Sequence, residues 1–249
     1  MARRPLIIGG YPFSLNHENC LDLDGATEEM RNATNTPVGI GNTWTIALWY
    51  RGPGSYGSAT ESIIGIGPSS GAINLITINM LGTSGNEPIR ISINNSAGTT
   101  FKQYVYNNQL LGTGWNHLVT TWDGTSLLFY RDSVLRPPDA LSTDNPGTMT
   151  STDRRFSVGT SLVGVNNIDG KFHSLALWDV ALPASDIVTL YNAGDGSTFH
   201  AGNIQTPHIV QYWLFGYTTT DLFHNEIGSY DLGANAVDLD ATDIVADAP

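Results

Sequence analysis

Residues 43–51 read TWTIALWYR, and residues 89–94 read IRISIN. In the second segment every other residue is isoleucine, and in the first the alternate residues from Trp44 to Tyr50 are apolar. Successive side chains of a β-strand point to opposite faces, so a period of two gathers the apolar side chains on one face. Both segments therefore predict strands that bury one face in a core.

The same alternation recurs outward from these two segments along most of the chain. Eight further segments show it: residues 62–67, 73–81, 101–106, 115–122, 126–131, 155–159, 171–178 and 208–215. Asp24-Gly25, Asp123-Gly124 and Asp169-Gly170 predict turns, because Gly tolerates positive φ and Asp tolerates a left-handed conformation. Asp123-Gly124 lies between two alternating segments and so predicts a hairpin.

Residues 182–194 have the periodicity of a helix instead. Ile187, Leu190 and Tyr191 are apolar, Pro183 suits a helix start and Gly194 suits a C-terminal cap. About ten strands and one short helix near residues 183–192 exclude an α/β fold. They predict an all-β fold of two packed antiparallel sheets.

The composition is that of a single globular β-domain. Hydrophobic residues make up 41% of the chain and six residues are Trp, so a large core is available. We expect one domain over residues 19–237, preceded by an N-terminal arm over residues 1–18. Residues 238–249 are expected to form an acidic tail, in which Leu239, Ile244 and Val245 alternate weakly like an edge strand.

The charge excludes several classes of partner. The net charge is −12, and Lys102 and Lys171 are the only lysines. Nucleic acid and anionic membranes need clustered cations, so we expect neither as a partner. No stretch approaches the roughly 20 apolar residues that span a bilayer, and Pro5-Leu6-Ile7-Ile8 is too short for the core of a signal peptide. We therefore expect no membrane span and folding in the cytoplasm.

The single cysteine and the histidines are interpreted as structural. Cys20 has no second cysteine to pair with, and its position in an apolar strand predicts a buried, inert thiol. His117 and His173 lie inside strand patterns. They are expected to be core or rim histidines rather than metal ligands.

A series of short motifs resembles the laminin-G-like, concanavalin A-like lectin-glucanase jelly-roll family over residues 20–194. The motifs are Leu21-Asp22-Leu23-Asp24-Gly25, Trp44-Thr45-Ile46-Ala47-Leu48-Trp49, Trp115-Asn116-His117-Leu118-Val119, Trp122-Asp123-Gly124, Leu128-Phe129-Tyr130-Arg131-Asp132-Ser133 and Ile168-Asp169-Gly170-Lys171-Phe172. The resemblance implies a two-sheet antiparallel jelly-roll sandwich. Ser133 stands where the family has Gly, so we expect that turn to be longer or differently shaped. Residues 209–215 resemble a strand that many members carry before the opening strand, and here they could complete the sandwich from the other end.

Catalysis is not expected. Glycosidases of this superfamily use two nearby carboxylates, typically within Glu-x-Asp-x-x-Glu, and the sequence has no such run. Glu28 and Glu29 are adjacent and would point to opposite faces of a strand, so we interpret them as surface residues of a loop. The chain also lacks a Gly-x-Ser-x-Gly elbow, and Cys20 has no identifiable base.

Two kinds of binding remain open. Asp22, Asp24, Asn167 and Asp169 fall at strand or loop ends, where the resemblance implies a calcium ion. Asp24 and Asp169 are the candidate ligands, and the formation of turns is their alternative role. Sugar binding would use exposed aromatic residues. The alternative is that these residues are buried in the core between the sheets. The candidates are Tyr11, Tyr50, Tyr56, Tyr104, Tyr106 and Tyr217.

Three functions follow as alternatives. The first is a phage virion surface component, a capsid decoration or tail-associated protein, because the fold usually works outside cells and no export signal is predicted. This role predicts contact with host glycans, partner chains in a homo-oligomer, and pairing of residues 1–13 or 238–249 with a neighbouring chain. The second is a free carbohydrate-binding module or extracellular lectin that uses calcium. The third is a degenerate glycosidase-like enzyme.

Overall fold

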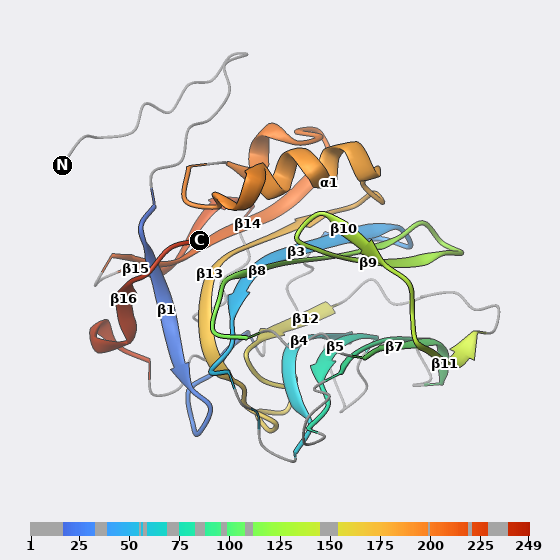
Figure 1. Cartoon of the computed structure of the whole chain (residues 1–249), viewed down its shortest axis with the longest axis horizontal. Coiled ribbons are helices and arrows are strands. Elements are labelled where there is room, and N and C mark those ends of the chain that lie inside the picture. The colour runs from blue at the N-terminus through green and yellow to red at the C-terminus, as the bar shows by residue number, and fades with distance from the viewer. Residues whose placement is uncertain are drawn as a thin grey trace.

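A computed structural model describes residues 17–32, 39–54, 56, 59–68, 75–82, 88–95, 99–107, 112–144, 154–198, 200–218, 221–228 and 239–249. These residues form two stacked antiparallel sheets, and one short helix, α1 (Ala184–Tyr191), lies on the outer side of the larger sheet (Figure 1). The predicted fold class, an all-β two-sheet jelly-roll sandwich with one short helix, is therefore confirmed.

The larger sheet has nine strands, and most of them follow the order β10-β9-β8-β3-β13-β1-β16. The strands are β1 (Asn19–Asp24), β3 (Trp44–Arg51), β8 (Asn116–Trp122), β9 (Leu127–Arg131), β10 (Val134–Arg136), β13 (Asp169–Trp178), β14 (Ile209–Thr218), β15 (Asp221–Ile227) and β16 (Ile244–Ala246). The long strand β13 pairs with β3 along one edge. Along its other edge it pairs first with β1 and then with β14. The predicted segment 208–215 thus completes this sheet.

The smaller sheet has seven strands in the order β11-β7-β6-β5-β4-β12-β2. They are β2 (Met30–Asn32), β4 (Glu61–Pro68), β5 (Ile76–Met80), β6 (Ile89–Asn94), β7 (Thr100–Tyr106), β11 (Ala140–Asp144) and β12 (Arg154–Val158). Ile89, Ile91 and Ile93 of β6 are fully buried between the sheets. The alternation in IRISIN therefore does mark a strand with one face in the core.

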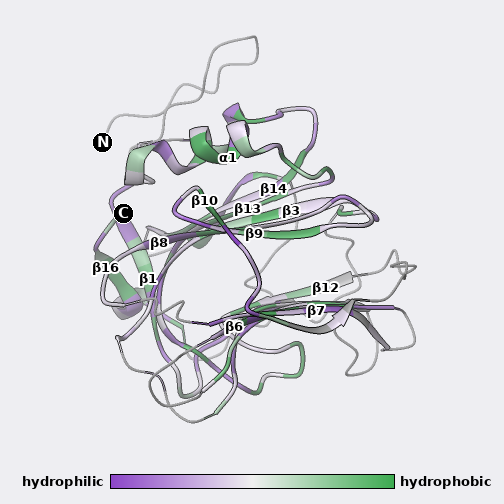
Figure 2. Ribbon diagram, turned by 45° about the vertical axis from the view of Figure 1, so that its right-hand side comes forward, coloured by the Kyte–Doolittle hydropathy of each residue, from purple (hydrophilic) through white to green (hydrophobic). Residues whose placement is uncertain are grey.

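The central part of the larger sheet is buried on both of its faces. Trp213 of β14 stacks on Phe156 of the opposite sheet, with ring centroids 5.5 Å apart. On the other face, Ile187 and Leu190 of α1 pack in a second cluster with Trp178. Figure 2 shows α1 lying over this face of the sheet. Because both faces are covered, the side chains of β8 are buried along its whole length.

The residue that caps the C-terminus of the helix comes two residues earlier than the sequence suggests. Pro183 occupies the N-cap position as predicted, but the left-handed residue that ends α1 is Asn192, with φ of 49°. Gly194 follows two residues later, so its predicted role as the cap is wrong. Asn tolerates this conformation better than other residues with a side chain.

The Asp-Gly pairs behave differently from one another. Asp123-Gly124 joins β8 to β9, and the Asp123 carboxylate accepts hydrogen bonds from the backbone N–H of Thr125 and Ser126. That hairpin is confirmed. Asp169-Gly170 lies inside β13, so the predicted turn at this position is wrong.

The turn between β9 and β10 is as tight as a hairpin turn can be. Arg131 pairs with Val134, which leaves only Asp132 and Ser133 in the loop, with φ of 52° and 63°. The expectation of a longer loop is wrong. The backbone keeps a two-residue type I′ turn, in which both central residues have positive φ. Ser133 adopts this conformation at the steric cost that a side chain carries there.

Replacing Ser133 with glycine is expected to raise the free energy of unfolding by about 0.5–1 kcal/mol. The change removes a left-handed penalty of about 1–2 kcal/mol, part of which the extra chain entropy of Gly offsets. Chemical denaturation measures the difference. Ser126→Gly is the matched control, since Ser126 has no positive φ, and it should be destabilising. Equal effects of the two substitutions would contradict the assignment.

The C-terminal segment belongs to the domain. Residues Asn19, Cys20 and Leu21 of β1 pair with Ala246, Val245 and Ile244 of β16. The chain thus covers an edge of β1 with its own strand. The expectation of a separate tail is therefore wrong for residues 244–246. Pairing of residues 238–249 with a neighbouring chain stays a prediction, and residues 1–13 lie outside the described residues.

Buried polar residues near β1 also differ from the expectation. Glu28 and Glu29 are only 9% and 4% exposed, so their interpretation as surface residues is wrong. Glu28 accepts a hydrogen bond from the Asp24 backbone N–H, and Glu29 accepts one from Arg31 Nε at 2.6 Å. These partners allow the two carboxylates to be buried.

The single thiol and the two strand histidines are buried as predicted. Burial raises the pKa of Cys20 to about 12, which keeps the thiol protonated and inert. Burial lowers the pKa of His117 and of His173 to about 3. No helix in the described segments is long and apolar enough to cross a membrane.

Candidate functional site

A row of charged side chains crosses three neighbouring strands of the larger sheet. In the strand register, Asp22 of β1 is opposite Lys171 of β13, and Lys171 is opposite Arg51 of β3. The next residues along these strands, such as Phe172 and Tyr50, are fully buried in the core between the sheets. Because strand side chains alternate, the charged row points to the outer face of the sheet.

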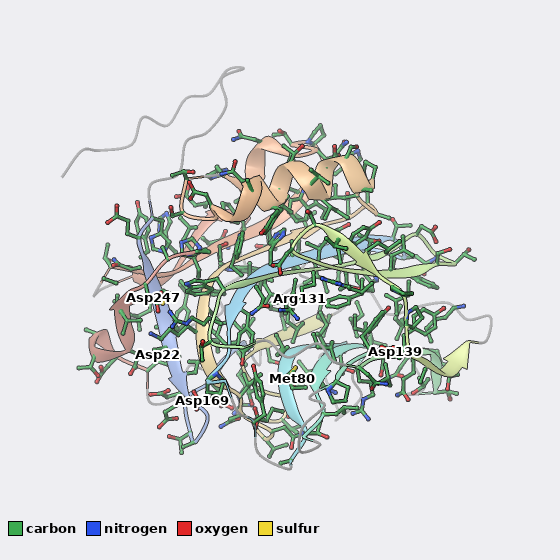
Figure 3. All side chains as sticks on the ribbon, in the orientation of Figure 1. Asp22, Met80, Arg131, Asp139, Asp169 and Asp247 are labelled. Atoms are coloured by element: carbon green, nitrogen blue, oxygen red, sulfur yellow. The ribbon has the colours of Figure 1, made fainter. Side chains whose placement is uncertain are left out.

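A surface pocket of about 210 Å³ lies at this row. Its lining residues are Asp22, Arg51, Gly52, Pro53, Thr113, Asp169, Gly170 and Lys171. Figure 3 shows Asp22 and Asp169 on the same side of the molecule, near β1. Lys171 Nζ lies 3.6 Å from Asp22 Oδ2, so charges of both signs meet at the pocket. A concave site with a few convergent polar groups is the usual form of a small-ligand site.

Gly170 explains why Asp169 and Lys171 lie where they do. Its φ is +144°, and a Cβ built on it would lie 2.7 Å from the Arg51 carbonyl oxygen and 2.7 Å from the Tyr50 hydroxyl. The Tyr50 hydroxyl donates a hydrogen bond of 2.7 Å to the Asp169 carbonyl. Only Gly leaves room for this close approach of β13 to β3.

Asp247, just after β16, is bound to the same row. Its Oδ2 accepts bonds from Arg51 Nη1 at 2.5 Å and from Lys171 Nζ at 3.0 Å, and its Oδ1 accepts one from Trp115 Nε1 at 3.1 Å. Burial raises the pKa of the Asp247 carboxyl, but the hydrogen bonds from Lys171 and Trp115 and the charge of Arg51 outweigh burial and bring the pKa below its ordinary value. Asp247 is therefore ionised at neutral pH.

The predicted calcium ligands are only partly brought together. Asp24 and Asp169 are register partners across β1 and β13. Burial, together with the charges of Asp22 and Asp24, raises the pKa of Asp169. Asn167 instead donates to the Ala26 carbonyl at 2.8 Å. Within the described segments, no group of three or more His, Cys, Asp or Glu residues is placed to hold a metal ion. Calcium binding at Asp24 and Asp169 stays a prediction.

A calcium site at this pair predicts a higher Tm in the presence of the ion. An ion that binds only the folded state at ten times its Kd stabilises that state by about 1.4 kcal/mol, which raises the Tm of a domain of this size by about 3–5 °C. Asp169→Asn should abolish the increase. Calorimetry with millimolar calcium and with magnesium as a control measures it, and an unchanged Tm would leave Asp24 and Asp169 with a structural role.

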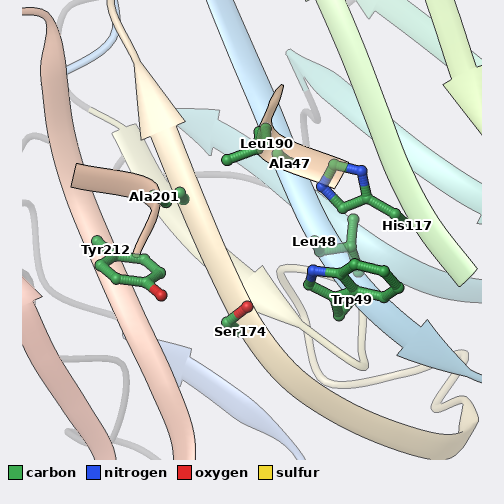
Figure 4. A pocket seen from close by; sticks show the side chains of 9 residues that line it. Ala47, Leu48, Trp49, His117, Ser174, Leu190, Ala201 and Tyr212 are labelled. Carbon is green, nitrogen blue, oxygen red and sulfur yellow. The ribbon is translucent and has the colours of Figure 1, made fainter. Parts of the chain in front are cut away.

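A second crevice lies beneath α1 on the same sheet. Figure 4 shows His117, Trp49, Ser174 and Tyr212 around it. Its volume is about 20 Å³, which suits a single water-sized group and not a sugar. The low pKa of His117, caused by burial, also makes this histidine a poor general base at neutral pH.

The tyrosine candidates for sugar binding are mostly core residues. Tyr50, Tyr104 and Tyr106 are 0%, 9% and 0% exposed. Tyr56 and Tyr217 are half-buried, and Tyr217 stacks on His224 at 4.1 Å. Tyr11 lies outside the described residues. Among the described candidates none lines the pocket, so the aromatic criterion does not identify the site.

The outer face of the smaller sheet is polar, but its side chains bond to one another. Gln103 Nε2 donates to Ser92 Oγ at 3.0 Å, and Ser62 Oγ bonds to Asn79 Oδ1 at 3.2 Å. Ser62, Asn79 and Ser92 are each at most 9% exposed. The side chains of the charged row are paired as well, but Asp22, Arg51 and Lys171 are 39%, 33% and 26% exposed, so the row is more accessible to a ligand.

Sequence reasoning selected Asp22 and Asp169 but missed Arg51, Trp115 and Asp247. The alternation in residues 43–51 already places Arg51 on the face opposite Tyr50. What the sequence lacks is the register that sets Arg51 beside Lys171, and the pairing of β16 that brings Asp247 to them.

Comparison with known proteins agrees with this architecture. The laminin G profile of the concanavalin A-like lectin/glucanases superfamily matches residues 24–188. The heptameric SAP-like pentraxin from Limulus polyphemus is similar in structure, with a TM-score of 0.51 and 14% identity, over 70% of this chain and 82% of the pentraxin chain.

A second similar structure is the CBM40 of the IT-sialidase from Ruminococcus gnavus, bound to α2,3 sialyllactose. Its TM-score is 0.53 and its identity 10%, over 69% of this chain and 96% of the CBM40 chain. No curated protein matches the sequence. Identities this low show a common fold alone, but the family profile covers well over half of the sequence. The chain therefore belongs to the concanavalin A-like lectin/glucanases superfamily.

Proposed function

We propose that this chain is a non-catalytic carbohydrate-binding domain and that the pocket at Asp22, Arg51, Asp169 and Lys171 holds the glycan. The observation that carries the proposal is the meeting of two carboxylates and two cations around one open pocket on the sheet. Membership of a superfamily of lectins and glucanases supports a sugar as the ligand. The CBM40 of similar fold, which was solved with sialyllactose, is consistent with this choice.

The chemistry of the pocket suits sugar hydroxyl groups. Each hydroxyl donates one hydrogen bond and accepts others, so it is matched by a carboxylate on one side and an ammonium or guanidinium on the other. Thr113 adds a further hydroxyl to the lining. Trp115 is half-buried. It binds the same carboxylate, Asp247, as Arg51 and Lys171 do, and so it offers an aromatic surface near the pocket.

A non-catalytic role is favoured over the degenerate enzyme. Glycoside hydrolysis needs a protonated carboxyl and a carboxylate on opposite sides of the bond. Partial burial, followed by the charges of Asp22 and Asp24, raises the pKa of Asp169, but much of its side chain stays in contact with water. Asp22 lies beside Lys171. Neither carboxylate is enclosed in the kind of desolvated cleft that tunes a catalytic acid.

The virion surface role stays a prediction of the sequence. The support that it drew from the acidic segment is lost, because β16 pairs with β1 of its own domain. An extracellular binding domain explains the same pocket without an assembly partner. A homo-oligomer and contact with other chains likewise stay predictions.

Substituting Asp22 tests the proposed function. Asp22→Asn removes a charge from the pocket without adding volume. We expect it to weaken binding of a glycan selected from a glycan array at least tenfold, because a hydrogen bond to a charged group is worth about 1.5–3 kcal/mol. Isothermal titration calorimetry measures the change.

Asp139→Asn is the matched control, because Figure 3 places Asp139 at the opposite side of the molecule from Asp22. This variant should bind like the wild-type chain. Equal binding by the two variants, or an array on which the wild-type chain binds no glycan, would refute the proposed function.

A further inference from the structure

Three donors from separate parts of the fold converge on the carboxylate of Asp247. They are Arg51 at the end of β3, Lys171 in β13 and Trp115 just before β8, and together we call them the carboxylate cradle. Both carboxylate oxygens are bonded, one by the two cations and the other by the indole N–H. Such charge-assisted bonds to both oxygens are the way proteins recognise a carboxylate group.

The cradle belongs to the sandwich, whereas its occupant does not lie on a central strand. Arg51 and Lys171 face each other on two strands in the middle of the larger sheet. Asp247 follows β16, a strand of only three residues whose one pairing partner in the described part of the chain is β1. Ile244 and Val245 are half-buried and Ala246 is exposed. Short edge strands with little buried apolar surface are the parts of a fold that open most easily.

The cradle is also continuous with the candidate glycan pocket. Arg51 and Lys171 line that pocket and bind Asp247 at the same time. A ligand in the pocket that carries its own carboxylate therefore lies next to the two cations. It would bond to them in the way that Asp247 does.

We propose that the carboxylate cradle is a binding site for the carboxylate of an acidic sugar, of the uronic acid class, and that Asp247 is a built-in competitor for it. The inference rests on the proposed function, because the ring of the sugar lies in the same pocket. In the closed state Asp247 fills the cradle, and only neutral groups enter the pocket. When Asp247 leaves, the carboxylate of the sugar takes its place, and its ring hydroxyls face Asp22 and Thr113.

The competition has a measurable consequence. The apparent Kd of a ligand increases in inverse proportion to the fraction of molecules whose site is open. A tethered competitor also acts at a high effective concentration, of the order of millimolar for a short link. If Asp247 fills the cradle in nine of ten molecules, its removal tightens the binding of an acidic sugar about tenfold. A neutral sugar has no carboxylate for the cradle, so its binding should not tighten.

The test uses methyl β-D-glucuronide and, as its uncharged match, methyl β-D-glucopyranoside. Both are titrated by NMR into the wild-type chain, Asp247→Ala, and a chain that ends at Ala246 and so keeps β16. Both variants are expected to bind the glucuronide at least tenfold more tightly than the wild-type chain does. The glucoside has no carboxylate for the cradle, so neither variant should bind it more tightly than the wild-type chain does. The double variant Asp247→Ala, Arg51→Gln should lose the gain, and cooperative thermal unfolding shows that each variant is folded.

The outcomes separate the inference from the proposed function. If folded Asp247→Ala binds the glucuronide no more tightly than the wild-type chain, while the glucoside still binds, the competitor role of Asp247 is wrong and the proposed function stands. Glucuronide binding that appears only in the two variants supports the inference. If neither sugar binds to any of the proteins, the inference fails, whereas the proposed function stands or falls with the glycan selected from the array.

Discussion

Replacing Gly170 with alanine is expected to lower the free energy of unfolding by about 3 kcal/mol. The new Cβ would lie 2.7 Å from the Arg51 carbonyl oxygen and 2.7 Å from the Tyr50 hydroxyl, and φ is +144°. Overpacking of a tight site costs about 1–3 kcal/mol, and a left-handed φ adds about 1–2 kcal/mol. Because Gly170 lies between Asp169 and Lys171, glycan binding should weaken as well.

Gly41→Ala is the control for this prediction. A Cβ at Gly41 meets nothing within 4 Å, so its free energy of unfolding should change by less than about 0.5 kcal/mol. Urea denaturation of both variants measures the two values. A Gly170→Ala chain as stable as Gly41→Ala would show that β13 does not approach β3 as closely as described.

Acidification is expected to destabilise the fold below pH 6.5. Burial lowers the pKa of His117 to about 3, and burial followed by the charge of His17 lowers that of His173 to about 3. An unfolded histidine has a pKa near 6.5, so between pH 6.5 and pH 3 the unfolded chain binds two protons that the folded chain does not. Each such proton lowers the free energy of unfolding by about 1.4 kcal/mol for each unit that the pH falls.

Glu28 opposes this trend over part of the range. Burial raises its pKa from 4.5 to about 7, so between these values the folded chain holds a proton that the unfolded chain lacks. Two protons minus one leave a slope of about 1.4 kcal/mol per pH unit from pH 6.5 to 4.5, and below pH 4.5 the slope doubles.

Urea denaturation at a series of pH values between 7 and 4 checks both slopes. His117→Phe removes one of the protons that the unfolded chain binds, so it should lower each slope by about 1.4 kcal/mol per pH unit. The control is His224→Gln, because His224 is half-buried. A free energy of unfolding that stays constant from pH 6.5 to pH 4 would contradict the burial of these histidines.

The parts of the fold that local patterns encode were predictable. IRISIN forms β6 because alternating Ile and polar residues place all the Ile side chains on one face of a strand. Asp123-Gly124 forms a hairpin turn because the backbone preference of this pair is local. Ser133 shows the limit of this reasoning. The pairing of β9 with β10 holds a non-glycine residue in a left-handed conformation against its own preference.

The candidate site depends on long-range pairing, which explains why it was only partly predictable. Asp22 and Asp169 could be selected because acidic residues end strand patterns in the sequence. Arg51 and Lys171 become neighbours only through the register of β3 and β13. Asp247 lies in a segment whose acidic composition suggested a separate tail, and only the pairing of β16 with β1 brings it to the row.

The most direct test of glycan binding at the charged row is a ¹H–¹⁵N NMR titration of the full chain with a glycan that binds it on an array. We predict that the largest chemical-shift changes fall on the backbone amides of Asp22, Arg51, Thr113 and Lys171, which line the pocket. Changes centred on Ser92 and Gln103, on the outer face of the smaller sheet, would contradict the account.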